Sequence, residues 1–363
     1  MVMSNRVNFR AVVVFICAFF SVWGGAHDLW AKEYRAGFIY VTPSQDAGWS
    51  HSHDLGRQAL EKMPEVTTIF VDSISEDAHA ESVLTHMAGS GYDIVFATSF
   101  GYMEAVHRVA PNFPGTIFMH CSGYRRAKNV GVYFGRMYEA RYLTGLVAGA
   151  MTRTGVVGYV AAYPLPEVIR GINAFTLGVR EINPKASVHV RWVKSWHDAD
   201  RETQLANELV NGKADVLAQH LDSPATQIVA QKRGVYSVGY SQDMSAFAPQ
   251  AHLTAAVWHW EAIYEYTMKR VMEGRWTSEP IWWGLDRGVV DIGAFGPMVD
   301  KKIRDLVLSR RKLIAEGRHF VFAGPVKDQK GAVRIAAGAR PGDEELLGMN
   351  WFVHGVAGSP NPE

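Results

Sequence analysis

A repeating alternation of short apolar strands with amphipathic helices is the feature of this 363-residue sequence that most restricts its fold. The strands of the first series are expected at 36–41, 67–73, 92–99 and 116–122. The stretches between them carry apolar residues at helical spacing and are expected as helices at 52–63, 78–89 and 101–111. Strands that are apolar throughout and alternate with helices are typical of a parallel sheet covered on both faces. The sequence therefore predicts an α/β fold.

The same alternation starts again after residue 136, with a long helix expected at 137–153. The strands of this second series are expected at 155–163, 187–195, 214–221 and 235–241. Two such series within about two hundred residues indicate two similar lobes rather than one very wide sheet.

The last hundred residues are too few for a third domain, and no low-complexity linker separates the two series. They contain an apolar strand, a helix, the strand-rich stretch 281–292 and another helix at 299–317. We expect these elements to cross back between the lobes as a hinge of several segments. The expected division is 34–136 plus 256–285 for the first lobe, 137–255 plus 286–345 for the second, and 346–363 as a C-terminal tail.

The first residues have the pattern of a cleavable export signal. Arg6 and Arg10 supply positive charge, and the apolar run "AVVVFICAFFSVWGG" follows. Small residues permit cleavage after Ala26 or Ala31, and we favour Ala31. Residues 1–31 are therefore expected to be removed, which places the mature protein in the periplasm.

Two features argue against a permanent anchor. The apolar run is short for a membrane span, and Ile16 before Cys17 is larger than the small residue that a lipoprotein processing site requires. An uncleaved anchor remains the alternative. Cleavage would leave Cys121 without a second cysteine, which excludes an internal disulfide and a cysteine-based zinc site.

Composition and motifs narrow the function. The net charge is +1 with Lys and Arg scattered, which does not favour binding to nucleic acid or an anionic membrane. The chain lacks a Gly-rich phosphate loop, a nucleophile elbow and an HExxH motif. His120 beside Cys121 could suggest a thiol nucleophile, but a lone cysteine at a strand end is more typical of a core.

The stretch "QDAGWSHSHD" lies at the carboxyl end of the first strand, where ligands bind in open α/β sheets. His51 and His53 are two residues apart on an expected helix, so they point about 200° away from each other and cannot share a metal ion. We predict a ligand-facing loop with Trp49 as an apolar wall. The alternative is a plain helix start, capped by Asp46 or Ser50.

Other strand ends also carry aromatic, hydroxyl and carboxylate side chains. This mixture suits a flat heterocycle that is stacked on rings and recognised at its edge by hydrogen bonds. The candidate ligand-binding residues are Asp46, Trp49, Ser50, Ser99, Phe100, His220, Asp222, Tyr240, Ser241, Asp243 and Trp258. We expect no catalytic residue, no metal ligand and no cofactor.

Several segments resemble the basic membrane protein (Bmp) family of ABC-transporter substrate-binding proteins, which includes bacterial purine-nucleoside-binding lipoproteins. The marks are "QDAGWS", "YEARYLTGLVAGAMTRTGVVGYV", "NAFTLGVREINP", "SWHDADRETQLANELVNGKADVLAQHLDSP", "VGYSQD" and "WFVHGVAG". The resemblance implies a type I periplasmic-binding fold, with two doubly wound α/β lobes joined by a three-segment hinge and a ligand held between closing lobes. It also implies no catalysis and delivery of the ligand to a membrane permease with its own ATPase.

The first family motif usually reads Asp-x-Ser-Phe-Asn, with the aromatic ring stacking on the base. Asp46, Gly48, Trp49 and Ser50 fall on this motif here. The resemblance thus implies that the purine-stacking part is kept.

The ribose-holding part departs from the family. Ser241 matches the aspartate that usually holds the ribose hydroxyls, Trp258 matches a lysine, and Leu221 with Asp222 replaces a Gly-Gly segment. This pattern favours a free purine base over a nucleoside, and adenine most of all. Its amine would need a carboxylate acceptor, which Asp46 or Asp222 could supply.

The leading hypothesis is therefore a monomeric periplasmic binding protein for a purine base, with membrane contact only through its permease. A purine-nucleoside transport protein and a ligand-sensing module of a signalling system are the alternatives. An enzyme ranks after all of these.

Overall fold

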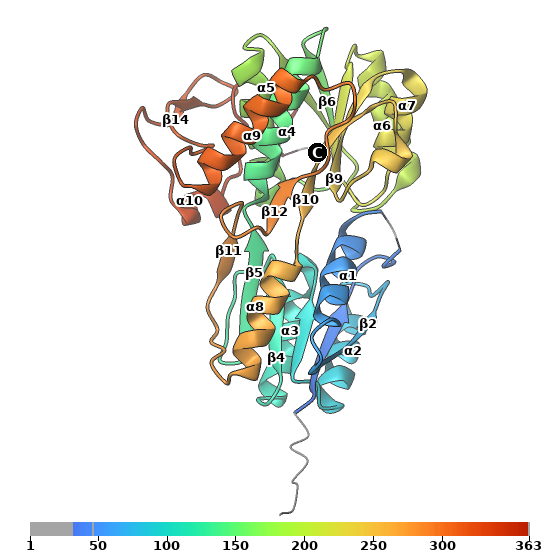
Figure 1. The fold of residues 1–363 in the computed structure, drawn as a ribbon, viewed down its shortest axis with the longest axis vertical. Coiled ribbons are helices and arrows are strands. Elements are labelled where there is room, and N and C mark those ends of the chain that lie inside the picture. Colours follow the sequence, from blue (N-terminus) through green and yellow to red (C-terminus); the bar gives the residue numbers. More distant parts are fainter. Residues whose placement is uncertain (1–31, 46, 362–363) are drawn as a thin grey trace, which may run out of the picture. The chain divides into compact units, whose positions relative to one another are not determined.

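The computed structural model describes residues 32–45 and 47–361. The expected signal segment 1–31 and Asp46 therefore lie outside the described residues. In the described part, two large sheets and their helices make two lobes, and the predicted α/β architecture is confirmed (Figure 1).

The first sheet has six parallel strands, in the spatial order β11 (Ile281–Trp283), β5 (Val130–Gly135), β4 (Ile117–Cys121), β3 (Ile94–Ala97), β1 (Tyr34–Ile39) and β2 (Val66–Val71). Its helices are α1 (Trp49–Leu60), α2 (Ala78–Gly89), α3 (Met103–Val109) and α8 (Glu261–Met272), with the short turns η1 (Phe100–Tyr102) and η2 (Ala110–Asn112).

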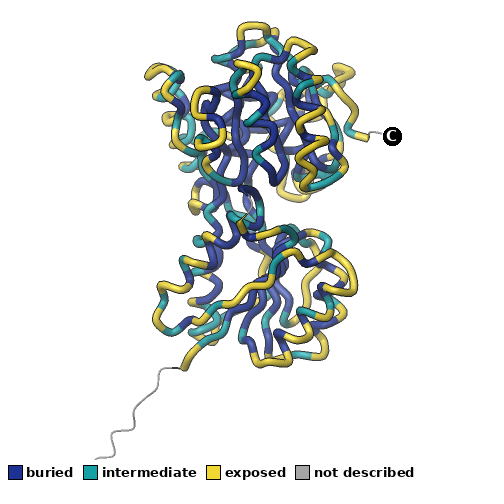
Figure 2. Tube along the Cα trace, turned by 90° about the vertical axis from the view of Figure 1, so that its right-hand side faces the viewer, coloured by how far each residue is buried: buried dark blue, intermediate teal, exposed yellow. Residues whose placement is uncertain are grey.

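Both faces of this sheet are buried because its side chains alternate between two hydrophobic clusters. Phe38 and Phe96 pack with Tyr264 of α8, with the Phe38 and Phe96 ring centroids 4.7 Å apart. Ile39 and Ala97 point the other way and join the cluster that α2 and α3 cover. Figure 2 shows the buried strands enclosed by half-exposed helices.

The second sheet has seven strands, in the order β12 (Val290–Ile292), β10 (His252–Trp258), β9 (Tyr236–Ser241), β8 (Val216–His220), β6 (Val156–Ala161), β7 (Ser187–Trp192) and β15 (Val356–Ala357). All are parallel except β12, which runs antiparallel to β10. Its main helices are α4 (Met137–Met151), α5 (Pro166–Ile182), α6 (Ala199–Asn211), α7 (Ala225–Arg233) and α9 (Lys301–Ala315), with the turn η3 (Ser245–Phe247).

Helices α4 and α5 pack unusually closely because glycines line their contact. A Cβ on Gly145 would lie 2.2 Å from the Phe175 carbonyl oxygen, and one on Gly149 would lie 2.4 Å from that of Val179. Both separations are too short for any side chain. The glycines of the "GLVAG" motif therefore allow two backbones to touch.

The chain crosses between the lobes at three places: β5 to α4, β10 to α8, and β11 to β12. Glu139 joins two of these crossings, because its carboxylate in the first turn of α4 accepts a hydrogen bond from the Leu285 N–H at 2.8 Å. Burial raises the pKa of Glu139 to about 7, and the Leu285 hydrogen bond and the Arg136 charge oppose this shift.

Two boundaries differ from those expected. Strand β10 stays paired in the second sheet as far as Trp258, because Val257 and Trp258 still have strand partners there. The tail also joins the second lobe, since β15 extends that sheet beside β7 and Phe352 is buried. The remaining elements are the β13 (Val326–Lys327) and β14 (Val333–Ile335) hairpin and α10 (Asp343–Leu347). None of the helices in the described ranges has both the length and the apolar character to span a membrane.

Candidate functional site

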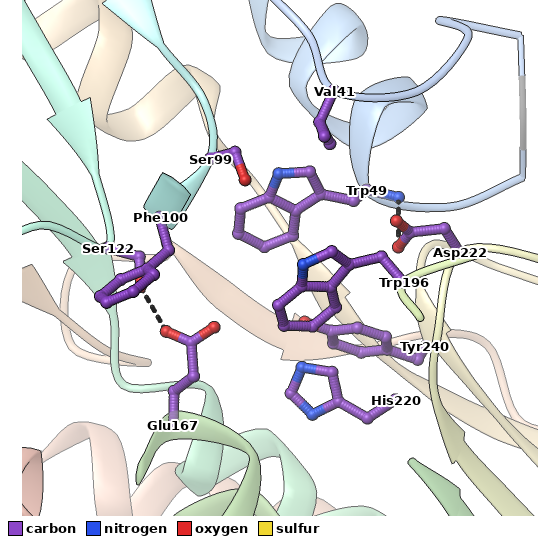
Figure 3. Close-up of a pocket in the computed structure, with 10 residues that line it drawn as sticks. All are labelled: Val41, Trp49, Ser99, Phe100, Ser122, Glu167, Trp196, His220, Asp222 and Tyr240. Carbon is purple, nitrogen blue, oxygen red and sulfur yellow. Dashed lines mark hydrogen bonds between the residues drawn. The ribbon is translucent and has the colours of Figure 1, made fainter. Parts of the chain in front are cut away.

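The carboxyl ends of strands from both sheets surround one cavity (Figure 3). Its empty volume is about 390 Å³, including the open mouth. The first lobe contributes Val41, Trp49, Ser99, Phe100 and Ser122, and the second contributes Glu167, Trp196, His220, Asp222 and Tyr240. The cavity thus lies at the place where parallel α/β sheets bind ligands.

Trp49 is a fixed wall of this cavity. Its indole N–H donates to the Thr98 carbonyl at 2.6 Å. The rings of Trp258 and Trp260 meet it edge to face at centroid distances of 5.7 and 5.4 Å. These contacts hold the half-buried ring in one orientation, so little ordering is needed when a ligand stacks on it.

Tyr240 and His220 line the opposite side, on strands of the second sheet. The buried guanidinium of Arg141 lies 3.9 Å from the Tyr240 ring centroid and donates to the Gln219 carbonyl at 2.6 Å. Burial holds the pKa of His220 well below its usual value, and the charges of Arg141 and Arg170 lower it further. At neutral pH this imidazole is therefore uncharged, with one donor and one acceptor nitrogen.

Two carboxyl groups reach the cavity from the second lobe, and each accepts a hydrogen bond from the first. The Glu167 carboxyl accepts one from the Ser122 hydroxyl. Burial raises the pKa of Glu167, while the Ser122 bond and the Arg170 charge act in the opposite direction. The Asp222 carboxylate accepts from the backbone N–H of Trp49 at 3.3 Å. Figure 3 shows these two bonds on opposite sides of the aromatic rings.

Six of the predicted residues line the cavity: Trp49, Ser99, Phe100, His220, Asp222 and Tyr240. Asp46 lies outside the described residues. The remaining four predicted residues do not line the cavity. Ser50 bonds the Thr42 hydroxyl at 2.7 Å, Asp243 is exposed and accepts from the Ser245 N–H, and Ser241 is fully buried. Trp258 stacks on Trp260, with ring centroids 4.2 Å apart, behind the Trp49 wall.

The remaining lining residues were not identified from the sequence: Val41, Ser122, Glu167 and Trp196. Ser122 directly follows a predicted strand, which is the same signal that singled out Ser99. Trp196 lies in the "SWHDAD" segment, which the sequence did not mark as the end of a strand. Glu167 stands in the first turn of α5, six residues beyond the end of β6, and it accepts a hydrogen bond from Ser122 of the opposite lobe.

The two helix histidines have separate partners. His51 contacts the Ser44 carbonyl, and His53 contacts the Tyr264 hydroxyl at 2.5 Å. Cys121 lies in a buried core cluster, and burial raises the pKa of its thiol well above the usual value. The thiol therefore stays protonated, which is the unreactive form. His120 beside it contacts the Ser99 carbonyl at 2.8 Å.

The lining suits recognition rather than reaction. Four aromatic side chains supply flat apolar faces, and two carboxyl groups, one neutral imidazole and two serine hydroxyls supply polar contacts. Pockets that hold small molecules combine apolar walls with a few placed polar groups in this way.

Comparisons with known proteins agree with this geometry. The family model described as "ABC transporter substrate-binding protein PnrA-like" (Bmp) matches residues 34–318. A purine-binding protein of Brucella abortus is 39% identical over 347 residues, covering 95% of this chain and 98% of that protein. A protein of Haloferax volcanii named as a candidate ABC transporter glucose-binding protein is 36% identical, covering 90% of this chain and 81% of that protein.

Solved structures show the same fold at low identity. An ABC transporter solute-binding protein from Conexibacter woesei superposes with a TM-score of 0.67 at 21% identity, covering 79% of this chain and 98% of that one. One from Aeropyrum pernix gives 0.68 at 18%, covering 86% and 97%. These neighbours have the periplasmic-binding fold of two α/β lobes. Because the family model and the Brucella relative both match most of its length, the chain belongs to the Bmp family of PnrA-like ABC transporter substrate-binding proteins.

Proposed function

We propose that this substrate-binding protein captures a purine base, adenine above all, between its two lobes in the periplasm and presents it to its permease. Members of the family bind ligands without catalysis, work outside the cytoplasm, and serve a membrane permease and its ATPase. What is proposed here is the ligand, the residues that hold it, the compartment and export by the 1–31 signal.

The observation that carries the proposal is the set of aromatic rings facing the cavity from both lobes. Among the described residues, no ring contact joins Trp49 or Phe100 to Trp196 or Tyr240 across the cavity. A planar heterocycle between these surfaces would gain stacking on both faces.

The polar groups fit the edge of adenine. Its exocyclic amine needs an acceptor, and its ring nitrogens accept hydrogen bonds. Glu167 and Asp222 supply carboxyl oxygens, and the neutral His220 supplies one donor and one acceptor. Hypoxanthine and guanine carry a carbonyl where adenine has its amine, so an ionised carboxylate would oppose it. An unpaired buried polar group costs about 1–3 kcal/mol, or roughly tenfold in affinity.

The surroundings of Trp258 and Ser241 support the proposal that the ligand is a free base rather than a nucleoside. The Trp258 ring fills the space between Trp260, Phe134 and Trp49, and its indole N–H donates to the Tyr240 hydroxyl at 3.3 Å. Ser241 is fully buried and is not part of the cavity lining. Neither residue offers a carboxylate or an ammonium group to ribose hydroxyls.

Calorimetry with adenine, hypoxanthine, adenosine and glucose tests the proposal. Adenine should bind at least tenfold tighter than hypoxanthine, and adenosine more weakly than adenine. Glucose is included because of the Haloferax relative's name, and binding of glucose alone would replace the purine proposal. Adenosine bound as tightly as adenine would contradict the argument that the ribose site is lost.

Substitution identifies the acceptor of the amine. Glu167→Gln, Asp222→Asn and Asp46→Asn each put an amide, which can also donate, in place of a carboxyl group. The variant that alters the group facing the amine should narrow the preference for adenine over hypoxanthine. Asp243→Asn, at an exposed position outside the cavity lining, is the matched control. If the three test variants all keep the full preference for adenine over hypoxanthine, none of these three carboxyl groups accepts a hydrogen bond from the amine.

A further inference from the structure

The amino end of α1 meets the second lobe at an unusually short distance. A Cβ built on Gly48 would lie 2.4 Å from the Cα and 2.4 Å from the carbonyl oxygen of Asp222. Contacts this short are with backbone, which cannot move aside as a side chain can. Only glycine at position 48 therefore lets the two lobes approach this closely.

The same approach supplies α1 with a cap. Gly48 is the N-cap residue of α1 and has no side chain to accept a hydrogen bond from the first turn. The Asp222 carboxylate takes that place from the other lobe, accepting from the Trp49 N–H at 3.3 Å. A carboxylate at this end of a helix also interacts favourably with the helix dipole.

The Asp222 loop is held in place within its own lobe. The Asp222 N–H donates to the Trp196 carbonyl at 3.1 Å. The next residue, Ser223, donates its hydroxyl to the buried Glu202 at 2.5 Å, and its carbonyl accepts from the Gln219 side chain at 2.9 Å. The loop is thus held in place within the second lobe, and its bond to α1 joins the two lobes.

The other side of the contact is equally fixed. Trp49 is anchored by Thr98, and the Ser52 hydroxyl links α1 to Trp260, whose indole N–H donates to it at 3.1 Å. Making or breaking the bond between Asp222 and α1 is therefore a movement of whole lobes.

We propose that Asp222 is a positioning residue that caps helix α1 across the lobe interface, and that this cap, together with the absence of a side chain at Gly48, sets the equilibrium between open and closed lobes. The proposal concerns closure itself and holds whichever ligand the cavity takes. An interaction made only in the closed state shifts the population toward that state by its differential free energy.

Small-angle X-ray scattering on the ligand-free mature protein tests this proposal. Asp222→Ala should lower the ratio of closed to open molecules by about fivefold, the usual effect of losing a helix cap, and so raise the radius of gyration. Gly48→Ala should lower this ratio at least as far, because its methyl group would overlap the Asp222 backbone. Asp222→Asn should keep the wild-type value, because asparagine caps helices as well as aspartate does.

Matched controls separate closure from general damage. Gly115→Ala adds a methyl group where nothing lies within 4 Å, and Glu208→Ala removes an exposed carboxylate of the same lobe as Asp222. Both should scatter like the wild type. If Asp222→Ala does not fold, Asp222→Ser takes its place, since its shorter side chain does not reach the Trp49 N–H.

The deciding comparison uses no ligand, so a failure of adenine to bind would overturn the proposed function and leave this inference standing. Scattering curves for Asp222→Ala and Gly48→Ala that match the wild type and the controls would overturn the inference. So would an Asp222→Asn variant as open as Asp222→Ala, because that result would assign the effect to charge rather than to capping.

Discussion

At the scale of single residues, Trp49 combines two roles. Its backbone N–H donates to the second lobe, while its indole ring forms the cavity wall within the first. Because the ring is fixed by Thr98, Trp258 and Trp260, its exposed face is a preformed stacking surface.

Removing that ring should weaken ligand binding without unfolding the protein. Stacking of a base on an aromatic side chain contributes about 1–3 kcal/mol, so Trp49→Ala should lower adenine affinity by about tenfold or more. Calorimetry measures the affinity and circular dichroism the fold. Trp192→Ala, at a half-buried position on β7 outside the cavity lining, should bind adenine normally. Unchanged affinity in Trp49→Ala would place the ligand elsewhere.

Residues of the site were predictable where the signal is local. Trp49, Ser99, His220 and Tyr240 line the cavity, and each was a candidate because a residue near the carboxyl end of an apolar strand lies at the ligand-binding edge of the sheet. Their contact with a ligand stays a prediction. Glu167 lacks that signal, since it enters the cavity only because another lobe stands opposite α5. The bond from the Trp49 N–H to Asp222 was equally hidden, because it joins residues 173 positions apart.

At the scale of elements, the strands and helices were predictable because apolar spacing is a local property. The expected helices at 52–63 and 78–89 correspond to α1 (Trp49–Leu60) and α2 (Ala78–Gly89). The pairing of β15 with β7 was not predictable, since a two-residue strand has no periodicity. The reason for the glycines in α4 also appears only once α5 lies against them.

Those glycines predict that a glycine-to-alanine substitution in α4 lowers stability, which is the opposite of its usual effect in a helix. Alanine normally stabilises a helix interior relative to glycine by about 0.5–1 kcal/mol. Gly149→Ala should instead lower the free energy of unfolding by about 1–3 kcal/mol, because its methyl group would overlap the Val179 carbonyl. Urea unfolding measures the difference, with Gly115→Ala as the unobstructed control. A stabilised Gly149→Ala would mean that α4 and α5 can separate freely.

The buried Glu139 at the hinge predicts that the free energy of unfolding depends on pH. Its pKa is about 7 in the fold against 4.5 as its ordinary value, so the folded state binds this proton more tightly. The resulting stability is fully present below about pH 4.5 and is lost as the pH rises through 7. Glu139→Gln, which keeps an acceptor for the Leu285 N–H, should reduce the fall in unfolding free energy between pH 4.5 and 7. Urea unfolding across this range measures it, and an unchanged slope would contradict the prediction. Exposed Glu208→Gln is the control.

At the scale of the whole molecule, three crossings join the two lobes, and we expect the lobes to turn about them as units. Ligand held by both lobes should favour the closed arrangement. Saturation with adenine is therefore expected to shrink the radius of gyration in solution scattering. The control is hypoxanthine at the same concentration, which should produce less contraction because it binds more weakly. No contraction at saturating adenine would exclude closure around this ligand.

Cys121 lies in β4 at the centre of the first lobe, fully buried and with its thiol held protonated. If the signal segment is removed, this is the sole sulfhydryl of the mature chain. The native protein should therefore not react with thiol reagents. Any modification of Cys121 would require transient opening of the first lobe. The rate at which a chromogenic disulfide labels Cys121 would then measure how often the first lobe unfolds locally, without an engineered probe. Immediate labelling of the native protein would show that this lobe opens far more often than its packing implies.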